Sequence, residues 1–220
     1  MEFSRLRENM VARQIEGRGI RDPRVLAAMR NVPREQFVPD DLADLAYDDA
    51  PLPIGTGQTI SQPYVVALMT EALELEPGDR VLEIGAGSGY AAAVLAEIAQ
   101  RVYTIERHPD LAEYARRNLE RLGYDNVAVR CADGTRGWPE EAPFDAIVVT
   151  AGGPAVPESL REQLAAGGRL VIPVGGAKSA QQLLRIRHRG EADYAQETLG
   201  AVRFVPLIGE QGWENSRREP

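Results

Sequence analysis

The sequence predicts an α/β fold built on a doubly wound, mostly parallel sheet. From about residue 79 onward, short apolar runs alternate with segments of helical periodicity. A glycine-rich turn, VLEIGAGSGY, joins the first of these runs to a helical segment. The run FDAIVVTA is almost entirely apolar, which is typical of a strand buried on both faces of a parallel sheet. Alternation of strands and helices builds such a sheet with helices on its faces.

Seven strands are expected in this sheet. Short apolar runs bounded by turn residues predict five of them, at 80–84, 101–106, 127–131, 144–151 and 169–174. The segments QQLLRIR and ETLGAVRFVPL predict two more, which we expect to pair antiparallel and to close the sheet. Ligands of such sheets bind at the carboxyl ends of the parallel strands, where the winding reverses. This rule predicts that Gly85 to Gly89, Glu106, Asp133 and Thr150 to Gly153 surround a single crevice.

Three helices are expected between the strands. SGYAAAVLAEIA, at 88–99, is rich in small residues and follows the glycine turn. The segment 109–123 places four apolar residues on one helical face and ends at Gly123. A shorter helix is expected over 157–166, because the glycine pair 167–168 follows it.

We expect one domain, because 220 residues suffice for one sizeable core. Residues 1–78 predict short helical pieces separated by prolines, as a helical extension of that same domain. Residues 79–210 hold the α/β core, and residues 211–220 are expected to form a mobile tail. Within the extension, GTGQTISQPYVVAL follows a proline-rich connector and is expected to form a flexible lead-in to a helix.

The composition narrows the function classes. The net charge of −8 argues against broad binding to a nucleic-acid backbone, which needs a basic surface. One cysteine and two histidines provide no spacing suited to zinc, so no metal site is expected. No run of 18 apolar residues and no signal-peptide pattern occurs, so we expect no membrane association and a cytoplasmic location. We also expect a monomer.

The segment VLEIGAGSGY predicts a cofactor loop. Its three glycines, within 85–89, follow a strand and open a helix, where the lack of Cβ atoms lets a ligand lie against the backbone. Glu106 ends the next strand, where a carboxylate can accept both hydroxyls of an adenosine ribose. Asp133 and Gly134 follow the third strand, where an adenine ring would lie. A tight turn with nothing bound, and a solvated charge at Glu106, are the alternatives.

The glycine spacing favours S-adenosylmethionine over a dinucleotide. In the dinucleotide fingerprint the third glycine comes three residues after the second, whereas here it comes two residues after. An acidic residue, Glu83, stands two positions before the loop. This form resembles motif I of the class I methyltransferases, which bind S-adenosylmethionine. An NAD(P) oxidoreductase is the alternative from another class, and no evident Tyr-x-x-x-Lys pair supports it.

IGTGQTISQPYVVALMTEAL, ahead of VLEIGAGSGY, resembles the signature of the protein-L-isoaspartate O-methyltransferases. Four other segments of the chain are similar to segments of that family. They are the N-terminal MVARQIEGRGIRDPRVLAAMRNVPREQFVP, then YDDAPLPIG, ADGTRGWPEEAPFDAIVVTAGGPAVPESLREQLAAGGRLVIPVG and RFVPLIG. The resemblance spans roughly residues 5–210. It implies a Rossmann-like methyltransferase sheet of seven strands with an N-terminal helical extension.

The resemblance implies a protein-repair reaction. The methyl group of S-adenosylmethionine would pass to the free α-carboxylate of an L-isoaspartyl residue, leaving S-adenosylhomocysteine. The methyl ester then recloses to a succinimide, and hydrolysis returns part of it to aspartate. The implied partners are damaged proteins and peptides containing isoaspartate, and action on D-aspartyl residues is left open. A methyltransferase acting on a small-molecule carboxylate, and a binding module without catalysis, are the alternatives.

The resemblance also assigns site residues. The serine of the family's TIS motif corresponds to Ser61, which is implied as the catalytic residue. The implied cofactor-binding residues are Gln58, Thr59, Ile60, Ser61, Glu83, Gly85, Ala86, Gly87, Ser88, Gly89, Glu106, Arg107, Asp133 and Gly134. The chain departs from the family near its C-terminus, where Ile208 and Gly209 stand in place of a polar residue.

Two roles are open for Ser61. It precedes Gln-Pro-Tyr and an apolar run of helical spacing, so periodicity alone favours a helix N-cap. As a hydroxyl beside the acceptor, it would donate one hydrogen bond and fix the approach of the carboxylate. A carboxylate is already ionised at pH 7, so no general base is needed. His108 is interpreted as the lead-in to a helix.

Overall fold

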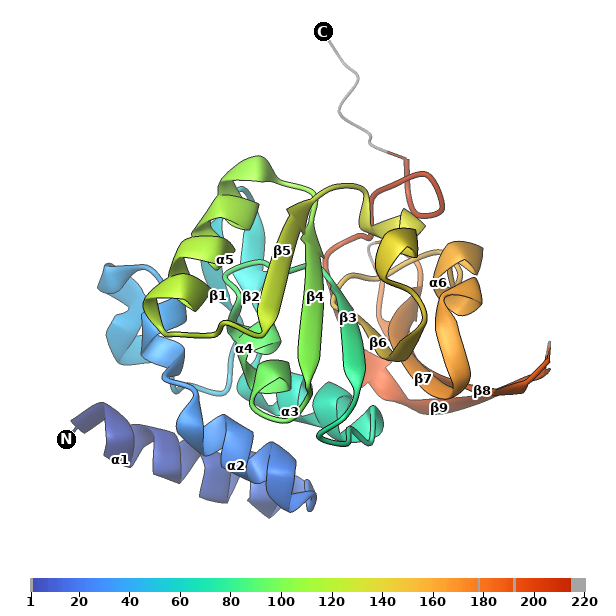
Figure 1. The fold of residues 1–220 in the computed structure, drawn as a ribbon. Coiled ribbons are helices and arrows are strands. Elements are labelled where there is room, and N and C mark those ends of the chain that lie inside the picture. The colour runs from blue at the N-terminus through green and yellow to red at the C-terminus, as the bar shows by residue number, and fades with distance from the viewer. Residues whose placement is uncertain (1, 178, 192, 215–220) are drawn as a thin grey trace, which may run out of the picture.

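The computed structural model describes residues 2–177, 179–191 and 193–214. Within them a sheet of seven strands runs in the order β5-β4-β3-β6-β7-β8-β9 (Figure 1). The strands are β3 (Arg80–Ile84), β4 (Arg101–Glu106), β5 (Val127–Cys131), β6 (Phe144–Val149), β7 (Leu164–Gly175), β8 (Gln181–Gly190) and β9 (Asp193–Val202). Neighbours from β5 to β7 are parallel, whereas β8 and β9 are antiparallel. The predicted fold class is confirmed.

Helices cover both faces of the sheet (Figure 1). The helices α3 (Pro63–Ala72), α4 (Tyr90–Ala96) and α5 (Pro109–Arg121) contribute to the core on one face, and α6 (Glu158–Glu162) to the core on the other. Side chains of β3 alternate between the two layers, so that Val81 packs in the first and Leu82 in the second. The winding reverses between β3 and β6, which places a ligand site at their carboxyl ends.

The N-terminal segment shares a core with the sheet. It comprises α1 (Glu2–Asn9), a π-helical turn (Met10–Ile15), α2 (Pro23–Asn31) and 3-10 turns at Glu16–Arg18, Arg34–Phe37 and Asp40–Leu45. Buried side chains of this segment, among them Ile15, Met29 and Phe37, belong to the same apolar cluster as α3 and α4.

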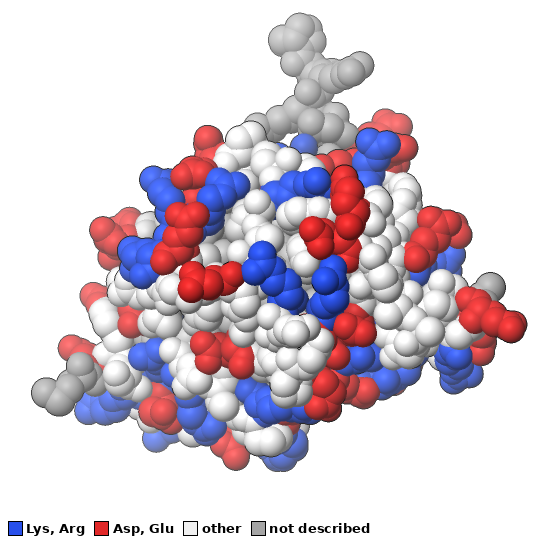
Figure 2. Space-filling view, in the orientation of Figure 1, with Lys and Arg blue, Asp and Glu red and all other residues white. Residues whose placement is uncertain are grey.

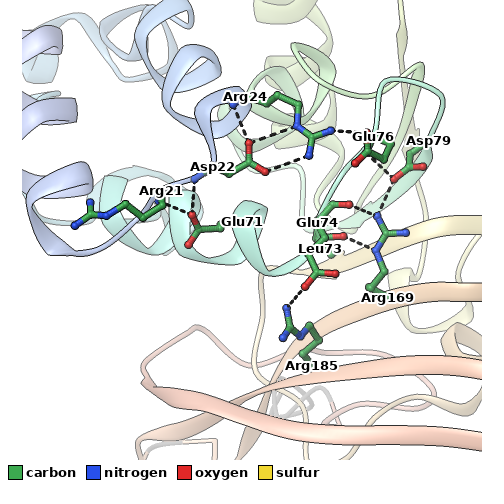
Figure 3. Close-up of polar contacts among 10 residues, drawn as sticks. All are labelled: Arg21, Asp22, Arg24, Glu71, Leu73, Glu74, Glu76, Asp79, Arg169 and Arg185. Carbon is green, nitrogen blue, oxygen red and sulfur yellow. Dashed lines mark hydrogen bonds and ion pairs between the residues drawn. The ribbon is translucent and has the colours of Figure 1, made fainter.

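Polar contacts fasten α2 to α3 (Figure 3). Glu71 on α3 accepts hydrogen bonds from the backbone N–H groups of Arg21 and Asp22, just ahead of α2. The side chain of Asp22 in turn caps α2 by accepting from the N–H of Arg24 over 2.8 Å. These bonds satisfy donors that a helix start would otherwise leave open.

The same C-terminal end of α3 is also tied to the sheet (Figure 3). Arg169 on β7 donates to the carbonyl oxygens of Leu73 and Glu74 and pairs with Asp79 over 2.9 Å. Its side chain is 13% exposed, so this ion pair is well shielded from water. The C-terminal end of the helix that follows the QTIS segment is therefore fastened both to the start of α2 and to the sheet.

A β-hairpin precedes α3, where a flexible lead-in was the expectation. The strand β1 (Leu52–Gly55) pairs antiparallel with β2 (Gln58–Ile60) across a turn at Thr56 and Gly57. Both turn residues have positive φ, 49° and 71°, which suits a two-residue hairpin turn. Threonine is rare at positive φ, so this pair is a weak turn signal in a sequence.

The N-cap interpretation of Ser61 is wrong. The N-cap of α3 is Gln62, whose side chain makes no capping hydrogen bond, and Pro63 is the first helical residue. Proline at this position has no N–H to satisfy, which lessens the need for a side-chain cap.

Two expected boundaries are also wrong. The helix expected over 157–166 is only five residues long, because Leu164 already pairs with β6 and begins β7. The strand expected over 197–207 leaves the sheet where β9 ends, and beyond it Pro206 forms only an isolated bridge with Gly152.

Part of the expected tail lies against the domain. The backbone N–H of Gln211 donates to the hydroxyl of Thr135 over 3.1 Å. The indole N–H of Trp213 donates to the carbonyl oxygen of Gly152 over 3.0 Å. Residues 215–220 of the predicted tail lie outside the described residues.

The surface carries both signs of charge. Figure 2 shows acidic and basic side chains interspersed over the face that Figure 1 presents. In the described ranges, no helix is long and apolar enough to cross a membrane. Over the same residues, no group of three or more His, Cys, Asp or Glu side chains could hold a metal ion.

Candidate active site

A cavity opens at the carboxyl ends of β3, β4 and β6, where the winding of the sheet reverses. The hairpin, the loops after these strands and the segment after β9 form its walls. The lining residues are Gln58, Thr59, Ile84, Gly85, Gly87, Ile105, Glu106, Arg107, His108, Gly134, Thr150, Ala151 and residues 205–208. We call this space the glycine-loop cavity.

The glycine loop turns sharply at the end of β3. Gly85 has a φ of 104°, and its N–H donates to the carbonyl oxygen of Ile105 over 2.8 Å. A Cβ atom at this position would collide with the hydroxyl of Thr150. That hydroxyl is hydrogen-bonded to the carbonyl oxygens of Ile84 and Gly85, at 3.0 and 2.9 Å. Only glycine fits here, because the backbone angle and the neighbouring hydroxyl both exclude a side chain.

Glu106, at the end of β4, is held by two backbone N–H groups. Oε2 accepts from Gly87 and Oε1 accepts from His108, each over 3.0 Å. The residue is 6% exposed and lines the cavity. Each carboxylate oxygen has two lone pairs, so one acceptor site on each oxygen remains for a ligand. Two such sites side by side fit the paired hydroxyls of a ribose.

Glu83 lies behind the glycine loop and does not line the cavity. It is fully buried on β3, where Oε2 accepts from the hydroxyl of Thr104 and Oε1 has no partner among the described residues. Burial, opposed by the Thr104 hydrogen bond and aided by the charge of Glu106, raises the pKa of Glu83 to about 8. At neutral pH this carboxyl group is therefore mostly protonated.

The carboxylate of Asp133 is engaged by the chain itself. Oδ1 accepts from the N–H and the hydroxyl of Thr135, over 2.9 and 2.7 Å. Oδ2 accepts from the N–H of Glu210 over 2.8 Å. Gly134 lines the glycine-loop cavity, whereas Asp133 lines a neighbouring cleft. Asp133 thus fastens the segment after β9 beside the cavity.

A wider groove meets the glycine-loop cavity at Thr59 and Thr150, which line both. Its volume is about 700 Å³. The hairpin and α3 form one wall, and the segment after β9 forms the other. The lining residues are Arg18, Pro51, Thr59, Ser61, Gln62, Tyr64, Val65, Leu68, Thr150, Ala180 and residues 201–205. We call this space the open groove.

Ser61 lies between the open groove and the glycine loop. It lines the open groove and also a small cavity against the glycine loop, which Gly85 and Gly87 line as well. Its carbonyl oxygen accepts a hydrogen bond from Arg34 over 2.8 Å. Across the described part of the chain, the Ser61 hydroxyl has no hydrogen-bond partner. The hydroxyl is therefore free for a bound acceptor.

Most of the predicted site residues are brought together. The glycine-loop cavity takes in Gln58, Thr59, Gly85, Gly87, Glu106, Arg107 and Gly134. The small cavity against the loop takes in Ile60, Ser61, Ala86 and Ser88. Glu83 and Gly89 line neither space. Gly89 is instead the N-cap of α4, with a φ of 90°, and lies against Leu119 of α5.

Thr150 and Ala151 follow β6 and line the cavity, as the carboxyl-end rule for parallel strands predicts. Other lining residues are missing from the sequence prediction. His108 lines the cavity in addition to starting α5. Residues 205–208 carry no local signal, because they reach the cavity through tertiary contacts such as the bond from Leu207 N–H to the Gly152 carbonyl.

The strand order, the glycine loop after β3 and the carboxylate that ends β4 define a class I methyltransferase that uses S-adenosylmethionine. The chain belongs to the protein-L-isoaspartate(D-aspartate) O-methyltransferase family, whose sequence model matches residues 5–212.

Similar proteins carry the same name. Protein-L-isoaspartate O-methyltransferase 2 of Pelobacter propionicus is 64% identical over 94% of this chain and 92% of its own length. Protein-L-isoaspartate O-methyltransferase 1 of Rhodopseudomonas palustris is 63% identical over 99% of this chain and 89% of its own length.

Solved structures share the fold. A protein-L-isoaspartate O-methyltransferase superposes with a TM-score of 0.84 at 33% identity, covering 94% of this chain and 67% of that one. A second, from Plasmodium falciparum, was solved in complex with S-adenosyl-L-homocysteine. It superposes with a TM-score of 0.77 at 30% identity, covering 93% of this chain and 97% of that one.

Proposed function

We propose that this chain is a protein-repair enzyme that methylates the α-carboxylate of L-isoaspartyl residues in damaged proteins and peptides. The observation that carries the proposal is the free hydroxyl of Ser61, placed between the open groove and the small cavity against the glycine loop. A methyl donor in the cavity and a peptide acceptor in the groove would meet at this hydroxyl. The names of the similar proteins support the same activity.

The residues of the glycine-loop cavity fit S-adenosylmethionine. The glycine loop lines the cavity at Gly85 and Gly87, where an amino-acid chain would lie against its backbone. Glu106 keeps one acceptor site on each oxygen for the ribose hydroxyls. When bound, S-adenosylmethionine supplies an electrophilic methyl group on a sulfonium.

The acceptor needs no general base. The pKa of a free carboxyl group is about 3.5 to 4, so the group is ionised at neutral pH. One carboxylate oxygen bonds to the methyl carbon while the methyl–sulfur bond breaks, and the electron pair of that bond stays on sulfur. Ser61 donates one hydrogen bond that orients the carboxylate. Alignment of two reactants can remove roughly 7–11 kcal/mol of a barrier.

The open groove supports a peptide acceptor over a small molecule. Its volume of about 700 Å³ exceeds what one carboxylate needs, and it extends along residues 201–205 beyond the end of β9. On the facing wall, the guanidinium of Arg18 lies 3.5 Å from the ring centre of Tyr64 and pairs with Asp49. This wall offers aromatic and charged surface to the residues that flank an isoaspartyl site.

Paired peptides that differ only in one aspartyl linkage test the proposal. The enzyme is incubated with S-adenosylmethionine labelled in its methyl group and with either the isoaspartyl or the aspartyl peptide. We expect base-labile label on the isoaspartyl peptide alone. Equal labelling of both peptides, or labelling of neither, would contradict the proposed acceptor. A third peptide that contains D-aspartate tests whether that residue is also methylated.

Three further expectations stay predictions from the sequence. They are a monomeric state, a cytoplasmic location, and the absence of nucleic-acid and membrane partners. The net charge of −8 supports the expectation about nucleic acids.

A further inference from the structure

A buried arginine holds the backbone of Ser61. Arg34 opens the 3-10 turn Arg34–Phe37 and is fully buried. Its Nε donates to the carbonyl oxygen of Ala46 over 2.7 Å, and its Nη2 donates to the carbonyl oxygen of Ser61 over 2.8 Å. The planar guanidinium thus joins two separate stretches of chain in one fixed geometry.

The Ser61 carbonyl lies outside the regular structure on both sides. β2 ends at Ile60, and the first N–H groups of α3 donate to Gln62 instead of Ser61. The bond from Arg34 is therefore what orients this peptide group. Because a side chain follows its own backbone, a peptide that rotates would carry the Ser61 hydroxyl with it.

The same guanidinium contacts the helix that follows the glycine loop. It lies 4.8 Å from the ring centre of Tyr90, the first residue of α4. Tyr90 and Ser61 both line the small cavity against the loop. Arg34 therefore contacts the cofactor side and the acceptor side of the site at once.

Stability alone does not account for an arginine at this position. Removing a guanidinium from water is costly, and Nη1 has no hydrogen-bond partner among the described residues. Burial accordingly lowers the pKa of Arg34. An apolar side chain of similar length would avoid this cost, although it would leave two carbonyl groups without a donor.

We propose that Arg34 is a positioning residue for methyl transfer, because it fixes the peptide group of Ser61, and with it the hydroxyl, against the glycine loop. This inference rests on the proposed function. It predicts that replacing Arg34 slows the methyl-transfer step and leaves cofactor binding nearly unchanged.

The test compares Arg34→Lys and Arg34→Met with the parent enzyme. Lysine keeps the positive charge but lacks the planar guanidinium that donates to two carbonyl groups at once. Methionine keeps roughly the length of the side chain but has no hydrogen-bond donor. For both we expect kcat on an isoaspartyl peptide to fall about 10- to 100-fold, the size that small misplacements of reactants produce. The dissociation constant of S-adenosylhomocysteine, measured by calorimetry, should change less than about twofold.

Arg169→Met is the matched control. Arg169 also donates to two backbone carbonyl oxygens, those of Leu73 and Glu74, but at the far end of α3. We expect this variant to melt at a lower temperature and to keep its kcat at temperatures where it is folded. If Arg34→Lys and Arg34→Met also kept their kcat there, or lost cofactor affinity in proportion, the positioning role would be overturned.

A double mutant separates action through Ser61 from a general effect. Single-turnover rates with enzyme in excess are compared for Ser61→Ala alone and combined with Arg34→Met. If Arg34 acts through the serine hydroxyl, the second change should alter the rate less than about twofold. An unchanged 10- to 100-fold loss in the Ser61→Ala background would refute the proposal. If the parent enzyme did not methylate isoaspartyl peptides, the proposed function would be refuted instead.

Discussion

Oε2 of Glu106 lies 3.0 Å from the backbone nitrogen of Gly87, so the carboxylate that ends β4 is bonded to the glycine loop that follows β3. The other oxygen holds the N–H of His108 at the start of α5. Two neighbouring strand-to-helix turns are thus locked together by one side chain. A cofactor therefore meets a site whose acceptor groups are already oriented.

Glu106→Gln should weaken cofactor binding. An amide has one oxygen to accept and one NH₂ to donate, so it can satisfy only one of the two backbone N–H groups that Glu106 now holds. We expect a loss of about 1–3 kcal/mol in the binding of S-adenosylhomocysteine, measured by calorimetry. Glu113→Gln, on the exposed side of α5, is the control and should bind normally. Equal affinity of the Glu106→Gln variant would remove Glu106 from the cofactor site.

Ser61→Ala should separate binding from turnover. The hydroxyl has no partner among the described residues, so its removal leaves no group of the resting protein unsatisfied. We expect kcat on an isoaspartyl peptide to fall about 100- to 1,000-fold, as when one oriented donor is removed from an active site. Melting temperature and cofactor affinity should stay near those of the parent. Full turnover in this variant would mean that another group orients the acceptor.

Gly85→Ala should damage the glycine loop. The new Cβ atom would meet the hydroxyl of Thr150, and alanine is strained at a φ of 104°. We expect a loss of about 1–3 kcal/mol in the free energy of unfolding, measured in urea, and weaker cofactor binding. Gly78→Ala is the control, because a Cβ atom at Gly78 would meet nothing within 4 Å and the φ of this residue is not positive. Equal effects of the two changes would contradict the tight fit assigned to Gly85.

Glu83 should make the stability of the protein fall as pH rises. Its pKa is raised from 4.5 to about 8 in the folded state, so between these values the folded chain keeps a proton that the unfolded chain has lost. The free energy of unfolding should therefore decrease through this window, by at most about 1.4 kcal/mol per pH unit from this group. Glu83→Gln should flatten the decrease in urea titrations between pH 5 and about 8. Parallel pH curves for parent and variant would show that Glu83 ionises normally.

The parallel half of the sheet is predictable because its signals are local. The strands at 80–84 and 101–106 are bounded in the structure as the apolar runs predict, and the glycine loop and Glu106 follow directly from where those strands end. The residues that follow parallel strands lie close together at one edge of the sheet, independently of distant parts of the chain. This is why Gly85, Gly87, Glu106, Arg107 and Gly134 line the glycine-loop cavity, whereas Gln58 and Thr59 reach it from the hairpin.

The sequence-based predictions that the structure contradicts fail for a different physical reason. Gln62 replaces Ser61 as the N-cap of α3 because the helix start already contains a proline, and Leu164 joins β7 because β6 offers it a partner. The pattern near Arg34 marks only a turn, since its acceptor at Ser61 lies 27 residues away. The carboxylate of Asp133 likewise accepts a hydrogen bond from the N–H of Glu210, a contact that no spacing in the sequence predicts. Tertiary contacts therefore determine these element boundaries and side-chain partners.

The segments that line the cofactor cavity come from both halves of the chain and are therefore synthesised at different times. A growing chain acquires the hairpin, the glycine loop and Glu106 early, but the wall at 205–208 arrives only after the antiparallel strands β8 and β9. The Leu207–Gly152 and Glu210–Asp133 bonds then fix that wall in place. A nascent chain that stops before residue 205 therefore carries the signature segments without an enclosed site.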